Sequence, residues 1–333
     1  MAVKDKGAQG KRVYLMDKVK ISVVIASYNG SEFLVEQLDS IRSQTLPPDE
    51  LIICDDLSKD NTVEVAENYI KEHNLEKLWR ITVNEKNMGY ADNFDNVAKQ
   101  ATGDLIFFSD QDDVWNPDKI EIMSKIMAEH PECKVLCSDY TPWYTGDNAP
   151  QAPRSVMDRM PDNGVLETVR LKKRSVYIGA LGCCMCVRRE FYSDISDYRF
   201  PGWAQDDRMW KMGQCIPGGC LILHRNLIKH RIHGSNTSTY GKYHTVERRV
   251  KLFNEMVEAE KQMLKYLEDN SAGDKETKII NKHISMMGKR ISLILERKIL
   301  NCISLIAFLP YYERKKSYFV EIYMALKVRN DSR

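Results

Sequence analysis

The chain has 333 residues, of which 43% are hydrophobic and 29% charged, with a formal net charge of +2. This is ordinary globular composition, and the near-neutral charge gives no bias toward nucleic acid as a partner. The nine cysteines include one C-x-x-C spacing, Cys183 to Cys186, without a second pair to complete a zinc cage. We therefore expect reduced, buried thiols. Because residues 1–18 lack the apolar core of a secretory signal, we also expect a cytoplasmic chain.

Short apolar runs alternate with amphipathic segments from Lys20 onward. The runs predict buried strands over residues 21–25, 51–54, 80–83 and 105–108. The intervening segments predict helices, the first capped by Ser31 and the next two over residues 61–72 and 91–100. Strands that alternate with helices imply right-handed crossovers and a mostly parallel sheet flanked by helices. The sequence therefore predicts an α/β fold.

Polar residues follow three of these strands where the strands end. In chain order they are Ser27, Tyr28, Asn29, Asp55, Asp56, Asp110, Asp112 and Asp113. Ligands of open α/β sheets bind beyond the carboxyl ends of the strands. Carboxylates gathered there would repel one another unless a cation or a hydrogen-bonding ligand lay among them. The first strand-to-helix turn lacks both G-x-G-x-x-G and the P-loop pattern, which disfavours a dinucleotide-binding or P-loop enzyme.

Asp110 and Asp112 form a D-x-D pair directly after a buried strand. Carboxylates in this arrangement suit Mg²⁺ or Mn²⁺ that also binds phosphate oxygens and neutralises a leaving diphosphate. A solvated acidic turn would explain an isolated D-x-D, but a neighbouring strand also ends in two aspartates, which favours the metal site. For Asp113, capping of a helix near Pro117 is an equally open interpretation.

Four ordered motifs resemble glycosyltransferase family 2, an inverting group with the GT-A fold. They are V-V-I-A-S-Y-N ending at Asn29, D-D-L-S-K-D-N-T from Asp55, N-M-G from Asn87 with Asn93, and G-D-L-I-F-F-S-D-Q-D-D-V-W ending at Trp115. The resemblance covers residues 20–238 and is similar in detail to rhamnosyltransferase-like members. It implies a GT-A-type, Rossmann-like catalytic domain, which we expect over residues 19–240, after a tail of residues 1–18 and before a helical region of residues 241–333.

The resemblance also implies roles for individual side chains. The implied donor-binding residues are Ser27, Tyr28, Asn29, Asp55, Asp56, Asn87, Asn93, Asp110, Gln111, Arg231 and Asn236. The implied metal ligands are Asp110, Asp112 and His233, with Asp112 favoured as the direct ligand. Asp206 or Asp207 would be the base that deprotonates the acceptor hydroxyl. Asp206 is favoured if Gln205 stands where the family has Glu or His.

The sequence thus predicts an inverting transfer of a rhamnose-, glucose- or galactose-type sugar from a UDP- or dTDP-sugar. The expected acceptor is a saccharide or a lipid-linked oligosaccharide of cell-surface polysaccharide synthesis. Two alternatives stay open. One is a sugar-phosphate nucleotidylyltransferase, whose glycine-rich, Arg- or Lys-bearing N-terminal loop is missing here. The other is a non-catalytic carbohydrate-binding relative, against which the intact acidic residues argue.

Long helical patterns begin near Tyr243 and are broken at residues 270–273. From Ile279 to Arg333 the chain carries 11 Lys and Arg against 4 Asp and Glu, a net charge of +7. One interpretation is peripheral binding to the anionic inner face of the cell membrane. The apolar residues that would enter the interface are Leu293, Ile299, Leu305, Phe308 and Leu309. The alternative is that these residues pack on the catalytic domain or form a homodimer.

Overall fold

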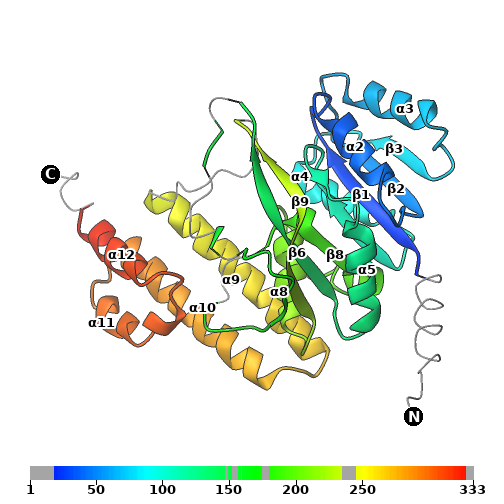
Figure 1. Ribbon diagram of the computed structural model, residues 1–333. Helices are drawn as coiled ribbons and strands as arrows, with labels where there is room; N and C mark the ends of the chain where they lie inside the picture. Colours follow the sequence, from blue (N-terminus) through cyan, green and yellow to red (C-terminus); the bar gives the residue numbers. More distant parts are fainter. Residues whose placement is uncertain are drawn as a thin grey trace, which may run out of the picture.

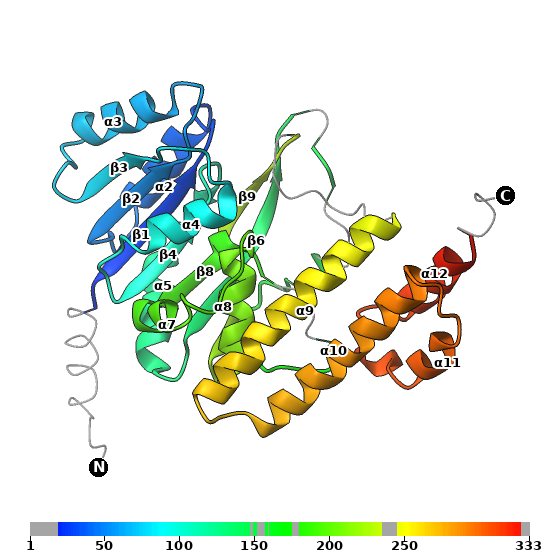
Figure 2. The same ribbon diagram turned by 180° about the vertical axis from the view of Figure 1, so that it is seen from behind.

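The computed structural model describes residues 19–146, 149–151, 157–158, 160–174, 180–234 and 245–327. In this part a nine-stranded sheet is covered on both faces by helices, with further helices at one end (Figures 1 and 2). The predicted tail of residues 1–18 and the predicted boundary at residues 240–241 lie outside the described residues. Among the described residues, no helix combines the length and apolarity needed to cross a bilayer.

Four parallel strands form one half of the sheet in the order β3-β2-β1-β4. They are β1 (Ile21–Ser27), β2 (Glu50–Asp55), β3 (Trp79–Val83) and β4 (Leu105–Ser109). Each residue of β2, and every residue of β1 except Ala26, is buried. Such continuous apolar runs are typical of parallel strands covered on both faces. The four predicted strands and the α/β class are confirmed.

The other half of the sheet is mixed. Its strands are β5 (Val114–Trp115), β6 (Val135–Tyr144), β7 (Leu166–Val169), β8 (Met185–Arg188) and β9 (Cys220–Ile232). Strand β8 is antiparallel to β4 and β6, β6 is parallel to β9, and β9 is antiparallel to β5 and β7. Strands β6 and β9 therefore run in the same direction as β1 to β4, and only β5, β7 and β8 of the described strands run in the opposite direction, so the expected mostly parallel sheet carries three antiparallel strands.

Helices α2 and α5 cover the face seen in Figure 1, and α4 and α8 cover the face seen in Figure 2. The helices of this part are α2 (Leu34–Arg42), α3 (Thr62–Glu72), α4 (Tyr90–Ala98), α5 (Lys119–Glu129), α7 (Arg189–Asp194) and α8 (Gln205–Gln214). The predicted capping of the first helix by Ser31 is wrong. The amides of Phe33 and Leu34 donate to the carbonyl of Gly30, so a turn precedes the helix. The Ser31 hydroxyl lies outside it and donates to Asp60 over 2.8 Å.

Helices α9 (Val246–Asp269) and α10 (Asp274–Ile294) are separated at the predicted break. Two short helical segments follow, α11 (Asn301–Ile306) and α12 (Lys315–Lys327). The late part of α9 packs into the same core as the sheet, whereas its early part joins α10 to α12 in a second core. All nine cysteines are free and eight are buried, as expected.

Candidate active site

Asp55 ends strand β2 and is fully buried. Its carboxylate accepts hydrogen bonds from the Ser27 hydroxyl at 2.9 Å and from the hydroxyl and amide of Ser58 at 2.6 and 2.7 Å. These contacts join the ends of β1 and β2 and fix the loop after β2. Asp55 thus supports that loop. The Ser27 side chain is itself buried in this contact, so the structure does not direct it toward an open donor pocket.

Asp56 is held by the segment that carries the N-M-G motif. Its carboxylate accepts from the backbone amides of Met88 and Gly89 and from the Asn84 side chain, each at 2.8 Å. Asn87 donates to the Asp56 carbonyl at 3.0 Å. The loop of residues 84–89 therefore closes against Asp56.

The amide of Asn84 also reaches Asn93. It donates to the Asn93 side-chain oxygen at 2.9 Å, and Asn93 donates to the Cys54 carbonyl at 2.9 Å. Both asparagines are buried and brace the loop from behind. Sequence reasoning missed Asn84, although it directly follows strand β3. Sequence analysis singled out the polar residues that directly follow three of the strands. The same criterion, applied to the strand before Asn84, would have identified it.

Gln111 joins the loops after β1 and β4. Its side chain accepts from the Tyr28 amide at 2.9 Å and donates to the Tyr28 carbonyl at 3.0 Å. A Cβ atom on Gly30 would lie 2.1 Å from the Gln111 side-chain oxygen, so glycine is needed for this approach. Asn29, with φ of 49°, accepts from the Lys59 amide at 2.8 Å. The predicted donor-binding residues of the β1, β2 and β4 loops are thus brought to one edge of the sheet.

Asp112 and His233 lie together at this edge. Their Oδ2 and Nε2 atoms are 2.8 Å apart. Burial, followed by the charge of Asp113, raises the pKa of Asp112. Burial and the charges of Asp113 and Asp112 raise the pKa of Asp110 to about 8. The three predicted metal ligands therefore occupy a region where negative charge is unfavourable without a cation.

Asp113 belongs with Asp110 and Asp112 to what we call the acidic cluster. It does not cap a helix, because the helix after it, α5, has Asp118 at its N-cap. One oxygen of its fully buried carboxylate lies 2.9 Å from His230 Nδ1 and accepts from the Arg231 amide at 3.0 Å. The other oxygen has no hydrogen-bond partner among the described residues. Potential metal-ligating atoms of four residues lie within 4.8 Å of one another: Asp110, Asp113, Cys183 and His230. Of these, sequence reasoning identified only Asp110 as a ligand.

Arg231 is buried and contacts the loop that carries Asp112. Its guanidinium stacks on Trp143 at 3.9 Å, donates to the Asp112 carbonyl at 2.6 Å and pairs with Glu36 at 2.5 Å. A β9 arginine tied to the loop in this way positions Asp112 and is not displayed toward solvent. Asn236, the other residue predicted to contact diphosphate from this segment, lies outside the described residues.

Asp206 and Asp207 stand in the first turn of α8. Asp207 accepts from the Trp203 indole at 2.7 Å and forms an ion pair with Lys211. Asp206 accepts from the Asp207 amide at 2.7 Å, and its Cβ lies 3.2 Å from the place that a Gly182 Cβ would occupy. Burial, followed by the charge of Asp207, raises the pKa of Asp206 to about 6. Asp206 also adds to the rise of the Asp110 pKa, so the two carboxylates share one region.

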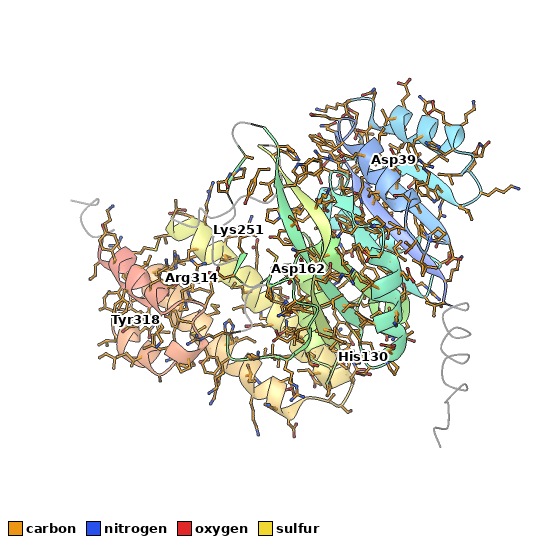
Figure 3. All side chains as sticks on the ribbon, in the orientation of Figure 1. Asp39, His130, Asp162, Lys251, Arg314 and Tyr318 are labelled. Atoms are coloured by element: carbon orange, nitrogen blue, oxygen red, sulfur yellow. The ribbon has the colours of Figure 1, made fainter. Side chains whose placement is uncertain are left out.

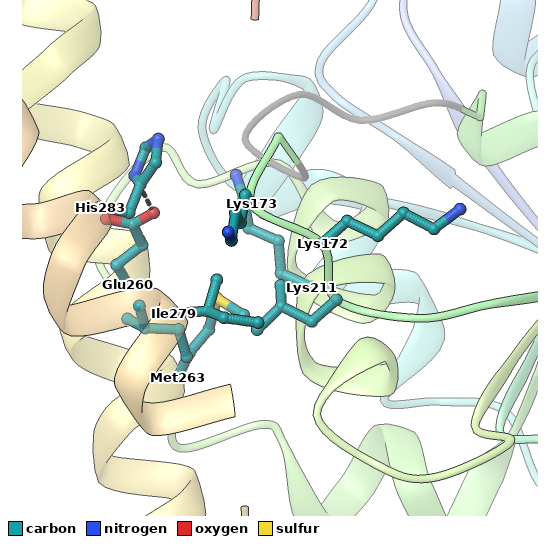
Figure 4. Close-up of a pocket in the computed structure, with 9 residues that line it drawn as sticks. Lys172, Lys173, Lys211, Glu260, Met263, Ile279 and His283 are labelled. Atoms are coloured by element: carbon teal, nitrogen blue, oxygen red, sulfur yellow. Dashed lines mark ion pairs between the residues drawn. The ribbon is translucent and has the colours of Figure 1, made fainter. Parts of the chain in front are cut away.

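A small pocket lies on the other side of α8, between this helix and α9 and α10. Figure 4 shows Lys211 on one side of it and the Glu260–His283 ion pair on the other. Lys211 thus connects the Asp207 carboxylate with the contact between α8 and the C-terminal helices. None of the residues that line this pocket belongs to the acidic cluster.

Comparisons with known proteins agree with this geometry. Residues 22–195, 174 of the 333, match the model of the family described as Glycosyl transferase family 2. An uncharacterised glycosyltransferase of Nostoc sp. is 26% identical over 242 residues, which cover 70% of this chain and 71% of that protein. Further curated relatives match over less than half of their own length. One is Staphylococcus aureus TarS, a poly(ribitol-phosphate) β-N-acetylglucosaminyltransferase, 32% identical over 34% of this chain and 19% of TarS.

Solved structures show the same fold. The crystal structure of TarS residues 1–349 with UDP-GlcNAc has a TM-score of 0.59 and 19% identity, covering 94% of this chain and 92% of that chain. A mannosyltransferase of Pyrobaculum calidifontis with GDP-Man and Mn²⁺ has a TM-score of 0.53 and 15% identity, covering 98% and 94%. These matches extend beyond residue 195, where the family match ends. The expected GT-A architecture with added C-terminal helices is confirmed.

Proposed function

Since the chain belongs to glycosyltransferase family 2, we propose that it transfers a hexosyl group from a nucleotide sugar to a saccharide hydroxyl with inversion. Family membership sets aside the nucleotidylyltransferase alternative. The observation that supports the proposal is the difference in surroundings between two adjacent aspartates. Lys211 neutralises Asp207, whereas Asp206 has its pKa raised to about 6 beside the acidic cluster. A general base with a pKa near neutrality is well suited to act at physiological pH.

The proposed reaction is a single displacement. Asp206 takes the proton of the acceptor hydroxyl, and the hydroxyl oxygen forms the new bond to the anomeric carbon. The bond from that carbon to the donor diphosphate breaks on the opposite side, and its electron pair leaves with the nucleoside diphosphate. Because one base suffices and no covalent sugar–enzyme intermediate forms, the second aspartate is free to serve in the ion pair with Lys211.

We propose Mn²⁺ or Mg²⁺ as the cofactor. The Asp112 carboxylate and the His233 ring offer an oxygen and a nitrogen 2.8 Å apart, with Asp110 in the same cluster. Carboxylates suit either ion, and a cation there would relieve the charge repulsion. When bound, the ion would offset charge on the leaving diphosphate. The Asp113 oxygen that has no hydrogen-bond partner among the described residues can accept one further hydrogen bond or metal contact.

We propose a UDP- or dTDP-sugar as donor. Three hydrogen bonds from the loop of residues 84–89 occupy the Asp56 carboxylate. A carboxylate has about four acceptor positions, which leaves one for the ring N–H of a pyrimidine. The structural relative TarS was solved with UDP-GlcNAc, which supports a uridine nucleotide. The mannosyltransferase, solved with GDP-Man, makes a guanine nucleotide the contrasting candidate. Rhamnose, glucose and galactose remain the proposed sugar types.

The proposed acceptor is a saccharide or a lipid-linked oligosaccharide of cell-surface polysaccharide synthesis, a setting suggested by the polymer named for TarS. A cytoplasmic location fits the nine free thiols. The experiment has two steps. A thermal-shift panel first tests UDP, dTDP and GDP in the presence of Mn²⁺. A donor-hydrolysis assay then uses the nucleotide sugars of whichever nucleoside diphosphate binds. A ligand that binds only the folded protein raises its melting temperature. Release of nucleoside diphosphate supports the proposal, and complete inactivity with every donor would favour a non-catalytic binding protein.

A further inference from the structure

Large exposed apolar side chains concentrate at the C-terminal helices. Nine of the 19 such residues in the described part of the chain lie between Leu295 and Leu326. Leu300, Ile303 and Phe319 have exposed fractions of 83%, 70% and 67%. Single exposed apolar residues are common on protein surfaces, but a group of this size in about a tenth of the chain indicates an interaction surface.

Helix α12 has two apolar faces. Tyr318 and Ala325 are on the buried face, which packs into the second core. Phe319, Tyr323 and Leu326 recur at intervals of three to four residues on the exposed face. An amphipathic helix of a protein surface would carry polar residues there. The exposed face of α12 therefore lacks the pattern expected of a face that meets water alone.

Helix α11 and the segment before it bring more apolar side chains to the same end of the molecule. The Tyr318 hydroxyl donates to the Cys302 carbonyl at 3.0 Å and so ties α12 to α11. Figures 1 and 2 place both helices at the end opposite β3, and Figure 3 shows Arg314 and Tyr318 there. We name the exposed residues of this end, 295–327, the C-terminal apolar surface. This surface lies entirely outside the part of the chain that matches the family model, which ends at residue 195.

The C-terminal apolar surface has a basic rim. Residues 295–327 contain six Lys and Arg, and of their three glutamates Glu321 is fully buried. Lys315 and Lys316 stand exposed at the start of α12, and Lys327 stands exposed at its end. Apolar side chains between cations match the layered chemistry of a bilayer surface, in which anionic headgroups overlie acyl chains.

We propose that the C-terminal apolar surface docks the protein peripherally on an anionic lipid bilayer. Of the residues expected from sequence, Ile299 is exposed on this surface, whereas Leu293 and Leu305 are fully buried in the second core. Charge favours a bilayer over a second copy of the chain. Two copies meeting through this surface would bring their basic rims together, whereas anionic headgroups would neutralise them. The inference concerns a surface remote from the acidic cluster and does not depend on the proposed function.

The test is co-sedimentation of the full-length protein with vesicles of phosphatidylglycerol and phosphatidylcholine, and with vesicles of phosphatidylcholine alone. We expect binding to the anionic vesicles that is weaker at high salt. The triple variant Leu300→Gln, Ile303→Gln, Phe319→Gln should reduce the bound fraction at least fivefold. The matched control is Leu78→Gln, Val83→Gln, which replaces side chains that are 50% and 49% exposed at the other end of the molecule. The control should bind like the parent.

Equal recovery in the supernatant with both kinds of vesicle would overturn the proposal. So would sedimentation velocity without lipid that showed a dimer dissociated by the triple variant, because a second copy would then cover the surface. The pair Lys315→Gln, Lys316→Gln gives a separate readout, since it leaves the apolar residues in place. It should weaken binding at low salt and make little difference at high salt. Equal binding by this variant and the parent at low salt would remove the electrostatic argument.

Discussion

The carboxylate of Asp207 is paired with the ammonium group of Lys211 one turn further along α8. The same carboxylate accepts a hydrogen bond from the Trp203 indole at 2.7 Å. Both contacts fall on the same oxygen, Oδ2, of the Asp207 carboxylate. Asp206, its neighbour in sequence, accepts from a backbone amide instead. The two aspartates are therefore not interchangeable.

We expect Asp206→Asn to lower kcat by roughly a hundredfold or more, the usual size of a general-base contribution, while nucleotide affinity stays unchanged. Asp207→Asn should retain most of the turnover and lower the melting temperature, because it removes the partner of Lys211. Initial rates with saturating donor, together with nucleotide titration by calorimetry, separate the two effects. The reverse pattern, with Asp207→Asn inactive and Asp206→Asn active, would assign the base to Asp207.

The pH dependence of transfer should reflect the same residue. The base acts only when ionised, so with a pKa of about 6 for Asp206 the rate should rise tenfold per pH unit below pH 6. It should then level off above that value. The measurement is kcat/KM with a constant Mn²⁺ concentration between pH 5 and pH 8. A profile that is flat down to pH 5 would be incompatible with a base of raised pKa.

The sequence was sufficient for the first half of the fold. Continuous β-branched runs such as residues 21–25 mark parallel strands because both faces of those strands are buried. The mixed half was not predictable, because β8 and β6 pair residues far apart in the chain, such as Cys186 with Leu136. Strand order there depends on tertiary packing and leaves no local pattern.

The site was predictable to the extent that it follows strand ends. Asp55, Asp56, Asp110 and Asp112 meet at one sheet edge for that reason. The contacts of Arg231 could not be read from sequence, because its stacking on Trp143 arises from the pairing of β6 with β9. The burial of Leu293 and Leu305 was hidden for a similar reason: helical periodicity gives an apolar face but does not say what covers it.

Metal binding should depend on the Asp112–His233 pair. We expect Asp112→Asn and His233→Gln each to weaken Mn²⁺ binding at least tenfold, since even the loss of a hydrogen-bond partner of a metal ligand commonly costs about tenfold or more. Mn²⁺ titration followed by electron paramagnetic resonance measures this directly, without donor or acceptor. The matched control is His224→Gln, a histidine whose ring lies 3.0 Å from Asp139. Unchanged Mn²⁺ affinity in both site variants would place the metal elsewhere in the acidic cluster.

Gly30→Ala should disturb the donor site without unfolding the protein. The new Cβ would meet the end of the Gln111 side chain, and a flexible side chain can move away at small cost. The two hydrogen bonds to Tyr28 would then be lost. We expect nucleotide affinity to fall several-fold while the melting temperature changes little, and Gln111→Ala should reproduce this result. If Gly30→Ala weakened binding and Gln111→Ala did not, loss of the two Gln111–Tyr28 hydrogen bonds would not be the cause.

The last prediction concerns Glu321, which joins three of the C-terminal helices. This fully buried carboxylate accepts from Arg249 of α9 at 2.9 Å and from Arg290 of α10 at 3.0 Å. Glu321→Gln would remove the counter-charge of the buried Arg290 and of the partly buried Arg249, and removing one partner of a buried ion pair costs about 3–5 kcal/mol. We expect a fall of that size in the free energy of unfolding, measured by urea denaturation followed by circular dichroism.

The matched control is Glu255→Gln on α9, where the pair with Lys251 is exposed and the change should stay within about 0.5 kcal/mol. Replacing Glu321, Arg249 and Arg290 together by leucine or methionine should be much less damaging than Glu321→Gln alone. The reason is that no unpaired buried charge remains in the triple variant. If Glu321→Gln were as mild as Glu255→Gln, water would have to reach this cluster, and the second core would be looser than its packing indicates.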